Sequence, residues 1–352
     1  MKLIHCADFH LDSALNANLD GDRKRLRKAE LLQNFVRIVE YAHTNKADAI
    51  IIAGDLFDGP NVSAETANVI KTTITRCKSV NFLYLKGNHD AVSILEQWEN
   101  PPANFMMFGT EWTYFGNDST VITGITVTKE NASTVYDSLI LEKNCANIVV
   151  MHGQTEKYRS ADVAETISLQ DLKNKNIDYL ALGHIHSYHC EPLDSRGVYC
   201  YCGTPEGRGF DECGEKGFVW IETTKDGKLT HKFVPFAKRM IREVKVDITG
   251  LEDTASVENK IRESLQGISG EDMVKVSLKG KVSMNAECNK MYLTKCFEPD
   301  YFAFTINNRG VGLAIHPEEY ENDISLRGEF IRLVMAGNYT EGEKRILSGR
   351  RT

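Results

Sequence analysis

The chain has 352 residues, of which 42% are hydrophobic, and a formal net charge of −7. This length exceeds the usual size of one hydrophobic core, so we expect a main domain with a smaller appended domain. The acidic balance argues against a protein that coats nucleic acid through bulk basicity, and no run approaches the roughly 18 apolar residues of a membrane span.

The first half of the chain alternates short apolar runs with helical patterns. The opening MKLIHCADFH begins like a secretion signal, but Asp8 interrupts it before an apolar segment of about seven residues can form, so we interpret it as the first core strand. Apolar spacing predicts helices over residues 26–42 and 62–77, the second begun by Ser63 as its N-cap. Further buried strands are predicted at 49–54, 81–87, 148–153 and 179–184.

Between residues 120 and 236 the predicted strands are less often separated by helices. They lie at 120–127, 197–204, 217–224 and 228–236, and a second sheet packed on the first would account for them. Beyond residue 237 the pattern changes to a strand at 242–248, a helix at 255–265 and strands at 273–282 and 301–306. We therefore predict one domain over residues 1–236 and a second over 237–352.

Polar side chains follow five of the predicted strands, each at the point where the strand ends. The carboxyl ends of strands in an open α/β sheet converge on one crevice, so these side chains should lie together. They are Asp8 and His10, Asp55, Asn88 with His89 and Asp90, His152, and His184 with His186.

The donor types in these clusters favour a metal site. Carboxylate, amide and imidazole groups without a thiolate suit Mn²⁺, Fe or Zn²⁺. There are too many donors for one small transition ion, whereas two ions that share a bridging carboxylate would use them all.

The five clusters resemble, in order, the signature of the calcineurin-like metallophosphoesterases: D-x-H, G-D-x-x-D, G-N-H-D/E, H and G-H-x-H. The stretches ADFHLDS, GDLFD and YCGTPEGRGFDECGEKGF are similar to those of the SbcD-type DNA-repair exonucleases. The resemblance implies an α/β fold, a four-layer α/β/β/α metallophosphoesterase sandwich over residues 1–236. Residues 237–352 would form a small C-terminal α/β capping domain for DNA recognition.

The resemblance also implies a role for each residue of the clusters. His89 would be the catalytic histidine, which stabilises or protonates the leaving oxygen, and Asp90 would orient its ring. Two divalent ions would share Asp55 as a bridging ligand. Mn²⁺ is the usual activating ion of the family, and Fe or Zn²⁺ are the alternatives. One ion would be held by Asp8, His10 and His186, and the other by Asn88, His152 and His184.

The implied function is metal-dependent DNA phosphodiester hydrolysis, as exonuclease and endonuclease, in double-strand-break repair. The implied partners are DNA, an SbcC-like SMC-type ATPase and a second copy of the chain, without a membrane. Nine cysteines without a repeated spacing indicate reduced thiols and a cytoplasmic location. Two alternatives stay open: a phosphoesterase that acts on a nucleotide or other small phosphoester, and a non-catalytic scaffold.

Four further features of the sequence each have a structural and a functional interpretation. We interpret Asp12 and Asp58 as structural contacts rather than ligands. One histidine and four cysteines invite a zinc-site interpretation, but we favour buried structural thiols: His189, Cys190, Cys200, Cys202 and Cys213. The basic run at residues 23–28, and Arg208, could contact a DNA phosphate or lie on a solvated surface. An apolar stripe could pack internally or on a partner helix; its members are Leu326, Phe330, Leu333 and Val334.

Overall fold

The computed structural model describes residues 1–15, 19–59, 61–90, 95–96, 98–155, 166–283, 286–314 and 324–337. The chain divides into two compact units, Met1–Met240 and Ile241–Thr352. Each unit has its own hydrophobic core. Within the described ranges, no helix combines the length and the apolar character needed to cross a membrane.

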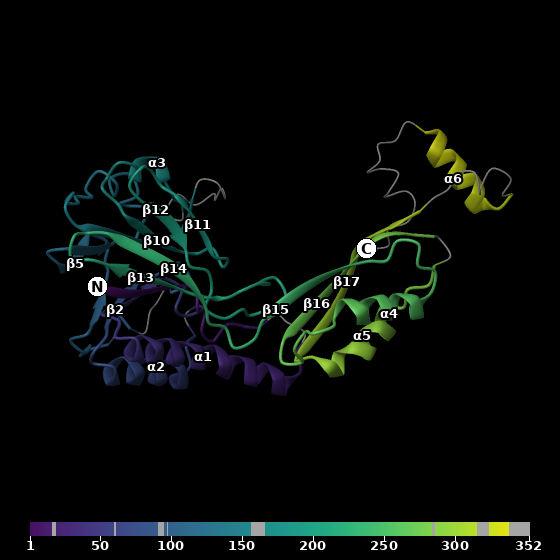
Figure 1. The fold of residues 1–352 in the computed structure, drawn as a ribbon, viewed down its shortest axis with the longest axis horizontal. Helices are drawn as coiled ribbons and strands as arrows, with labels where there is room; N and C mark the ends of the chain where they lie inside the picture. Colours follow the sequence, from purple (N-terminus) through teal and green to yellow (C-terminus); the bar gives the residue numbers. More distant parts are fainter. Residues whose placement is uncertain are drawn as a thin grey trace. The chain divides into compact units, whose positions relative to one another are not determined.

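The first sheet of unit 1 has the order β14-β13-β1-β2-β3-β4, of which β2, β13 and β14 are labelled in Figure 1. Neighbours among β1, β2, β3 and β4 are parallel, and β13 is antiparallel to both β1 and β14. The central strand β2 is buried along its whole length, as expected for a parallel strand covered on both faces. The strands are β1 (Lys2–Cys6), β2 (Ala49–Ala53), β3 (Asn81–Leu85), β4 (Phe105–Met107), β13 (Gly217–Thr223) and β14 (Leu229–Pro235).

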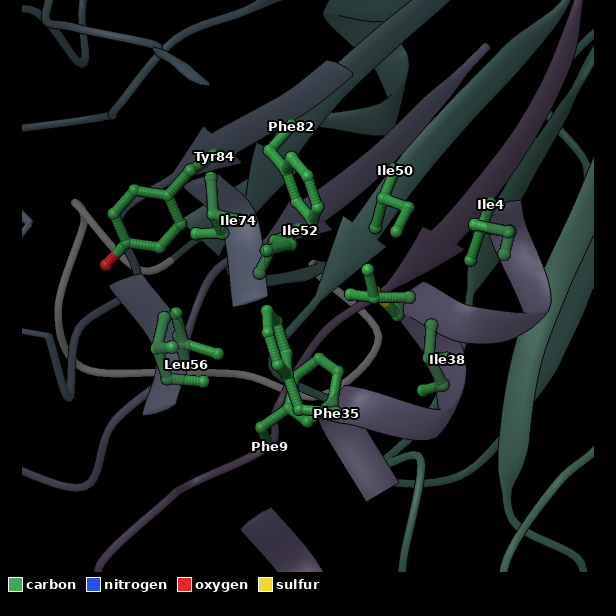
Figure 2. Packing of buried hydrophobic residues seen from close by; sticks show 14 of the residues in the cluster. Ile4, Phe9, Phe35, Ile38, Ile50, Ile52, Leu56, Ile74, Phe82 and Tyr84 are labelled. Atoms are coloured by element: carbon green, nitrogen blue, oxygen red, sulfur yellow. The ribbon is translucent and has the colours of Figure 1, made fainter. Parts of the chain in front are cut away.

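Two helices cover the outer face of this sheet, α1 (Gly21–Thr44) and α2 (Ala64–Arg76). The Ser63 side chain accepts a hydrogen bond from the Thr66 backbone N–H, which is the N-cap contact that the sequence predicts. Phe35 and Ile38 of α1 and Ile74 of α2 pack with residues of the sheet, including Ile50, in one apolar cluster (Figure 2).

The second sheet of unit 1 has the order β11-β12-β10-β7-β6-β5. Its inner face joins the first sheet in an apolar core that contains Ile51, Val150 and Val219. Its outer face is covered, among the described residues, by the one-turn helix α3 (Leu169–Leu172) and by turns at 129–138. The strands are β5 (Thr113–Asn117), β6 (Thr120–Gly124), β7 (Ala146–His152), β10 (Tyr179–Gly183), β11 (His189–Pro192) and β12 (Val198–Tyr201). The predicted sandwich is confirmed, with an outer layer thinner than a full helical layer.

Unit 2 is built on a parallel three-stranded sheet of order β15-β16-β17. Helices follow its first two strands as crossovers, and they bury Val257, Ile261, Leu293 and Phe297 against the sheet. The elements are β15 (Ile241–Asp247), α4 (Thr254–Ser264), β16 (Met273–Val282), α5 (Lys290–Phe297), η3 (Glu298–Asp300), β17 (Ala303–Leu313) and α6 (Leu326–Ala336). A separate two-stranded pair in unit 1 consists of β8 (Gln154–Thr155) and β9 (Thr166–Ile167).

A buried ion network joins α1 to the segments that follow β12 and β14. Arg27 Nη1 donates to Glu30 Oε2 at 2.9 Å, and Arg27 Nη2 donates to Glu206 Oε1 at 2.7 Å. Arg239 Nη2 donates to Glu30 Oε1 at 2.7 Å. Arg27 belongs to the basic run at 23–28 but is fully buried, so it is not available to a DNA phosphate. Arg23 and Arg25 lie beside acidic side chains in the first turn of α1.

Replacing Glu30 by glutamine should lower the free energy of unfolding by about 3 kcal/mol, because it leaves buried cations without their carboxylate. Burial alone would raise the pKa of Glu30, but hydrogen bonds from Arg239, Lys238 and Arg27 lower it from 4.5 to about 2. The stabilisation is therefore complete above about pH 4.5 and disappears as the pH falls towards 2. Urea unfolding of the variant and the wild type at several pH values measures both effects.

The exposed Glu40 on the same helix supplies the control, since Glu40→Gln should leave the unfolding free energy within about 0.5 kcal/mol of the wild type. A difference between Glu30→Gln and the wild type that stayed constant between pH 7 and pH 2.5 would contradict the ionic role of Glu30.

Candidate metal centre

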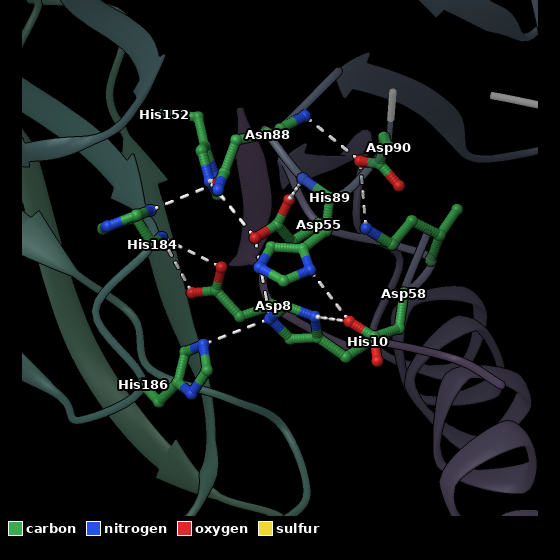
Figure 3. A network of polar contacts seen from close by, with 12 residues as sticks. Asp8, His10, Asp55, Asp58, Asn88, His89, Asp90, His152, His184 and His186 are labelled. Atoms are coloured by element: carbon green, nitrogen blue, oxygen red, sulfur yellow. Dashed lines mark hydrogen bonds and ion pairs between the residues drawn. The ribbon is translucent and has the colours of Figure 1, made fainter. Parts of the chain in front are cut away.

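The polar residues that follow five strands of unit 1 lie together at the carboxyl ends of β1, β2, β3, β7 and β10 (Figure 3). The two sheets each contribute, so the cluster spans the edge of the sandwich. Backbone hydrogen bonds tie the loops to one another: the Asp8 N–H donates to Gly54 O and the His10 N–H donates to Asp55 O, both at 3.0 Å. Asp8, His10, Asp55 and His184 all have positive φ angles of 45–102°. Strained backbone of this kind clusters at functional sites.

Two glycines allow the loops to approach so closely. A Cβ atom at Gly54, where φ is +93°, would lie 2.1 Å from His152 Nδ1. A Cβ atom at Gly87 would lie 2.2 Å from Asp55 Oδ1. The glycines of the G-D and G-N-H motifs are therefore required by the packing of ligand side chains, as well as by the turn itself.

Asp55 lies between two groups of donors. Its Oδ2 atom is 3.6 Å from His10 Nε2 and 3.3 Å from His152 Nε2, while its Oδ1 atom accepts from the His89 backbone N–H at 2.9 Å. Among the described residues, three groups of donors could each hold a metal ion: Asp8 with His10 and His186, Asp55 with His152 and His184, and His10 with Asp58 and His89. The third group shares His10 with the first and adds the half-exposed His89. Asn88 belongs to the second group, because its Oδ1 atom lies 2.9 Å from His152 Nε2 and 3.3 Å from His184 Nδ1.

Three of the predicted histidine ligands have Nδ1 bound to an acceptor that is not itself a predicted ligand. His10 Nδ1 lies 3.1 Å from Asp58 Oδ1, His152 Nδ1 lies 2.8 Å from Ala53 O, and His186 Nδ1 lies 2.8 Å from Glu212 Oε1. A carbonyl or carboxylate can only accept, so each of these Nδ1 atoms carries a proton and Nε2 is the nitrogen left to bind a metal ion. His10 Nε2 and His186 Nε2 lie 3.1 Å apart, directed at a common point. This arrangement fixes histidine ligands in metal proteins, and the donor set fits two divalent ions.

Burial and charge set the protonation of the centre. Burial lowers the pKa of His10 and of His184 to about 4, so both rings are neutral at pH 7, as metal binding requires. Burial would also lower the pKa of His152, but the Asp55 carboxylate raises it to about 9. Burial raises the pKa of Asp8 to about 7. Without metal the centre therefore holds protons that a bound cation would displace.

The ring of His89 is held by Asp58 and not by Asp90, contrary to the prediction. His89 Nδ1 lies 2.9 Å from Asp58 Oδ1, and the His89 side chain is 48% exposed. The buried Asp90 carboxylate accepts instead from the backbone N–H groups of Leu56, Phe57 and Gly87, at 2.8–3.2 Å. Asp90 thus holds two motif loops together, and Asp58 contacts both His89 and His10.

Glu212 is a residue of the centre that the sequence prediction missed. It is 5% exposed, and in addition to His186 Nδ1 it contacts Arg208, whose Nη2 donates to Glu212 Oε1 at 2.7 Å. Burial would raise the pKa of Glu212, but hydrogen bonds from His186 and Arg208 hold it well below its usual range. Lys216 Nζ donates to the His186 carbonyl at 2.7 Å. The segment after β12 therefore orients His186, and the stretch YCGTPEGRGFDECGEKGF contains Arg208, Glu212 and Lys216.

A Glu212→Gln variant should bind Mn²⁺ about 10 to 100 times more weakly at the half of the centre that contains His186, because a neutral amide holds the imidazole less firmly. Calorimetric titration with Mn²⁺ measures the change. Glu191→Gln is a matched control: Glu191 Oε1 lies 3.0 Å from His189 Nε2, another carboxylate and histidine pair, but outside the centre. Equal Mn²⁺ affinities for Glu212→Gln and the wild type would show that Glu212 has no such role.

The chain is similar in sequence to several known proteins. A family profile described as calcineurin-like phosphoesterase matches residues 1–188. The SbcD subunit of the SbcCD nuclease of Staphylococcus saprophyticus is 26% identical over 357 residues, which cover 91% of this chain and 89% of that protein. The protein of the same name from Escherichia coli is 26% identical over 65% of this chain and 66% of its own length. A solved structure described as a dimetal phosphatase from Danio rerio aligns with a TM-score of 0.48 at 12% identity, over 66% of this chain and 95% of that one.

Proposed function

The chain belongs to the calcineurin-like phosphoesterase family, and from this premise we propose that it is a DNA nuclease. As a member it is a metal-dependent phosphodiesterase. The observation that carries the proposal is the pair of donor groups on either side of the Asp55 carboxylate, which lies near His10 of one group and His152 of the other. The half-exposed ring of His89 lies beside them. The similarity to the SbcD subunit of the SbcCD nuclease over 91% of the chain supports DNA as the substrate.

Each half of the centre has a proposed ligand set. One ion would be held by Asp8, His10 and His186, the other by Asn88, His152 and His184, with Asp55 between them. Mn²⁺ is the proposed native metal, and Fe and Zn²⁺ are the alternatives that the same donors allow. When bound, the ions would supply Lewis acidity for the phosphoryl oxygens and for the attacking water.

The side chains of this protein have three tasks in the proposed reaction. Asp58 orients the His89 ring, since its Oδ1 atom is 2.9 Å from His89 Nδ1. The Nε2 atom of His89, the ring nitrogen that does not contact Asp58, would donate a hydrogen bond or a proton to the leaving oxygen. Glu212 holds His186 in position.

We further propose that the chain works in double-strand-break repair, in the cytoplasm, as a homodimer with an SbcC-like SMC-type ATPase. Residues 237–352 would be the capping domain for DNA recognition. The apolar stripe on α6 supports a protein partner: Leu326 is 86% exposed, Leu333 65% and Phe330 43% among the described residues, while Val334 is buried. A helix-in-groove contact would cover such side chains.

The test compares the purified chain with a His89→Gln variant on labelled duplex DNA, single-stranded DNA and bis-p-nitrophenyl phosphate, with and without Mn²⁺. Mn²⁺-dependent and His89-dependent cutting of DNA is expected. Hydrolysis of the small phosphodiester alone would instead identify an enzyme for small phosphoesters. If no phosphoester is cut with Mn²⁺, Fe²⁺ or Zn²⁺, a scaffold function is left.

A further inference from the structure

Two cysteines lie opposite one another at the edge of the second sheet, away from the metal centre. Cys190 is on the edge strand β11 and Cys200 is on its antiparallel neighbour β12, and the two are direct register partners. Both belong to the apolar core between the sheets. Cys200 is fully buried, whereas Cys190 is only partly buried, so one thiol of the pair is open to a small solute.

The register brings the two side chains as close as antiparallel strands allow. The Leu193 N–H donates to Gly197 O, which closes the hairpin and makes Leu193 and Gly197 a hydrogen-bonded pair. Hydrogen-bonded and non-hydrogen-bonded pairs alternate along an antiparallel ladder, so Cys190 and Cys200 form a non-hydrogen-bonded pair. In such pairs the Cα atoms are about 4.5 Å apart, within the range of about 4.4–6.8 Å that a disulfide spans.

The surroundings make the two thiols chemically different. Cys200 Sγ donates to Tyr201 O at 3.8 Å in the buried interior, whereas Cys190 is only partly buried. The neighbouring Cys200 side chain lowers the pKa of the Cys190 thiol, whereas the Cys190 side chain and burial raise the pKa of Cys200. Because Cys190 lies on the edge strand and is the less buried of the two, we assign it as the attacking thiol and the fully buried Cys200 as the resolving thiol.

We propose that Cys190 and Cys200 are a redox pair that closes to an intramolecular disulfide when it meets a hydroperoxide such as hydrogen peroxide. The Cys190 thiolate attacks one peroxide oxygen, the O–O bond breaks, and the departing hydroxide takes a proton to become water. The Cys200 sulfur then attacks the Cys190 sulfenic acid, the S–O bond breaks, and a second water leaves with the thiol proton. Two thiols lose two electrons, and one peroxide becomes two waters.

A zinc site, the other interpretation of these cysteines, lacks its further ligands. Among the residues that the structure describes, no group able to hold a metal contains a cysteine. His189 points to the opposite face of β11 from Cys190, where its ring lies 3.0 Å from Glu191. Cys213 donates to Phe210 O. Two thiols with no third donor suit a disulfide better than a tetrahedral ion.

The test treats the metal-free full chain with increasing hydrogen peroxide, blocks the remaining thiols by alkylation and maps the cysteines by mass spectrometry without reduction. We expect the Cys190–Cys200 disulfide to form while Cys145 and Cys288, which are also only partly buried, remain reduced. Dithiothreitol should reverse it. The proposal would be overturned if Cys190 needed as much peroxide for its oxidation as Cys145 and Cys288. It would also be overturned if Cys190 were oxidised to the sulfinic acid without forming the disulfide.

Two variants separate the roles of the thiols. In Cys200→Ser the disulfide should be absent, and dimedone should capture a sulfenic acid at Cys190. In the control Cys288→Ser the disulfide should form as in the wild type. Dimedone labelling at Cys200 in a Cys190→Ser variant, at the same peroxide concentration, would reverse the assignment and contradict it. If a buried serine prevents folding, the order of oxidation in the wild-type chain still decides the outcome.

Discussion

An Asp55→Asn variant should lose tight binding of both divalent ions and at least about 10³-fold of its hydrolytic rate. The Asp55 carboxylate lies 3.6 Å from His10 Nε2 and 3.3 Å from His152 Nε2, one in each half of the centre, so a single charge serves both ions. Loss of several kcal/mol of electrostatic stabilisation corresponds to a factor of that size. Equilibrium dialysis with metal analysis, and hydrolysis of bis-p-nitrophenyl phosphate, give the two readouts.

The control for this variant is Asp12→Asn. Asp12 lies close to Asp8 and His10 in sequence, but its carboxylate accepts from the Ser63 backbone N–H at the start of α2. Metal content and rate should stay close to wild type. Retention of two tightly bound ions by Asp55→Asn would exclude Asp55 as the bridging ligand.

Burial explains which parts of the fold could be predicted from the sequence. β2 and β7 are buried along their whole length, and their continuous apolar runs mark them as strands. β5 and β11 are edge strands with mixed exposure, and their sequences TYFGN and HCEP carry no such run. Their strand conformation depends on pairing with a neighbour, which no local pattern reports.

In the candidate site, too, the positions of some residues could be predicted from the sequence, whereas the contacts of others could not. Asp8, Asn88 and His152 each follow a recognisable strand, and convergence of strand ends was enough to expect them together. The partners of the histidines depend on side-chain direction after a turn. Asp90 is adjacent to His89 in sequence, yet it accepts from backbone N–H groups, and Asp58 reaches the ring from another loop.

Replacing His89 by glutamine should reduce kcat on DNA by about 10² to 10⁴-fold while both ions stay bound. The ring is 48% exposed and contacts Asp58 and the neighbouring His10 ring, whose centroid is 4.7 Å away. His89 is not one of the proposed ligands, so its loss should leave both ions in place. Parallel measurement of Mn²⁺ stoichiometry separates this outcome from that of Asp55→Asn. A His89→Gln variant that lost an ion would show that His89 is a ligand.

The choice of leaving group tests what His89 does. If the ring protonates the leaving oxygen, the variant should lose far less activity on bis-p-nitrophenyl phosphate, whose phenolate leaves without a proton, than on DNA, whose alkoxide needs one. Asp58→Asn should show a weaker form of the same contrast together with weaker metal binding, because Asp58 Oδ1 also lies 3.1 Å from His10 Nδ1. Equal losses on the two substrates would instead assign His89 to charge stabilisation of the phosphoryl group, since that task is the same for either leaving group.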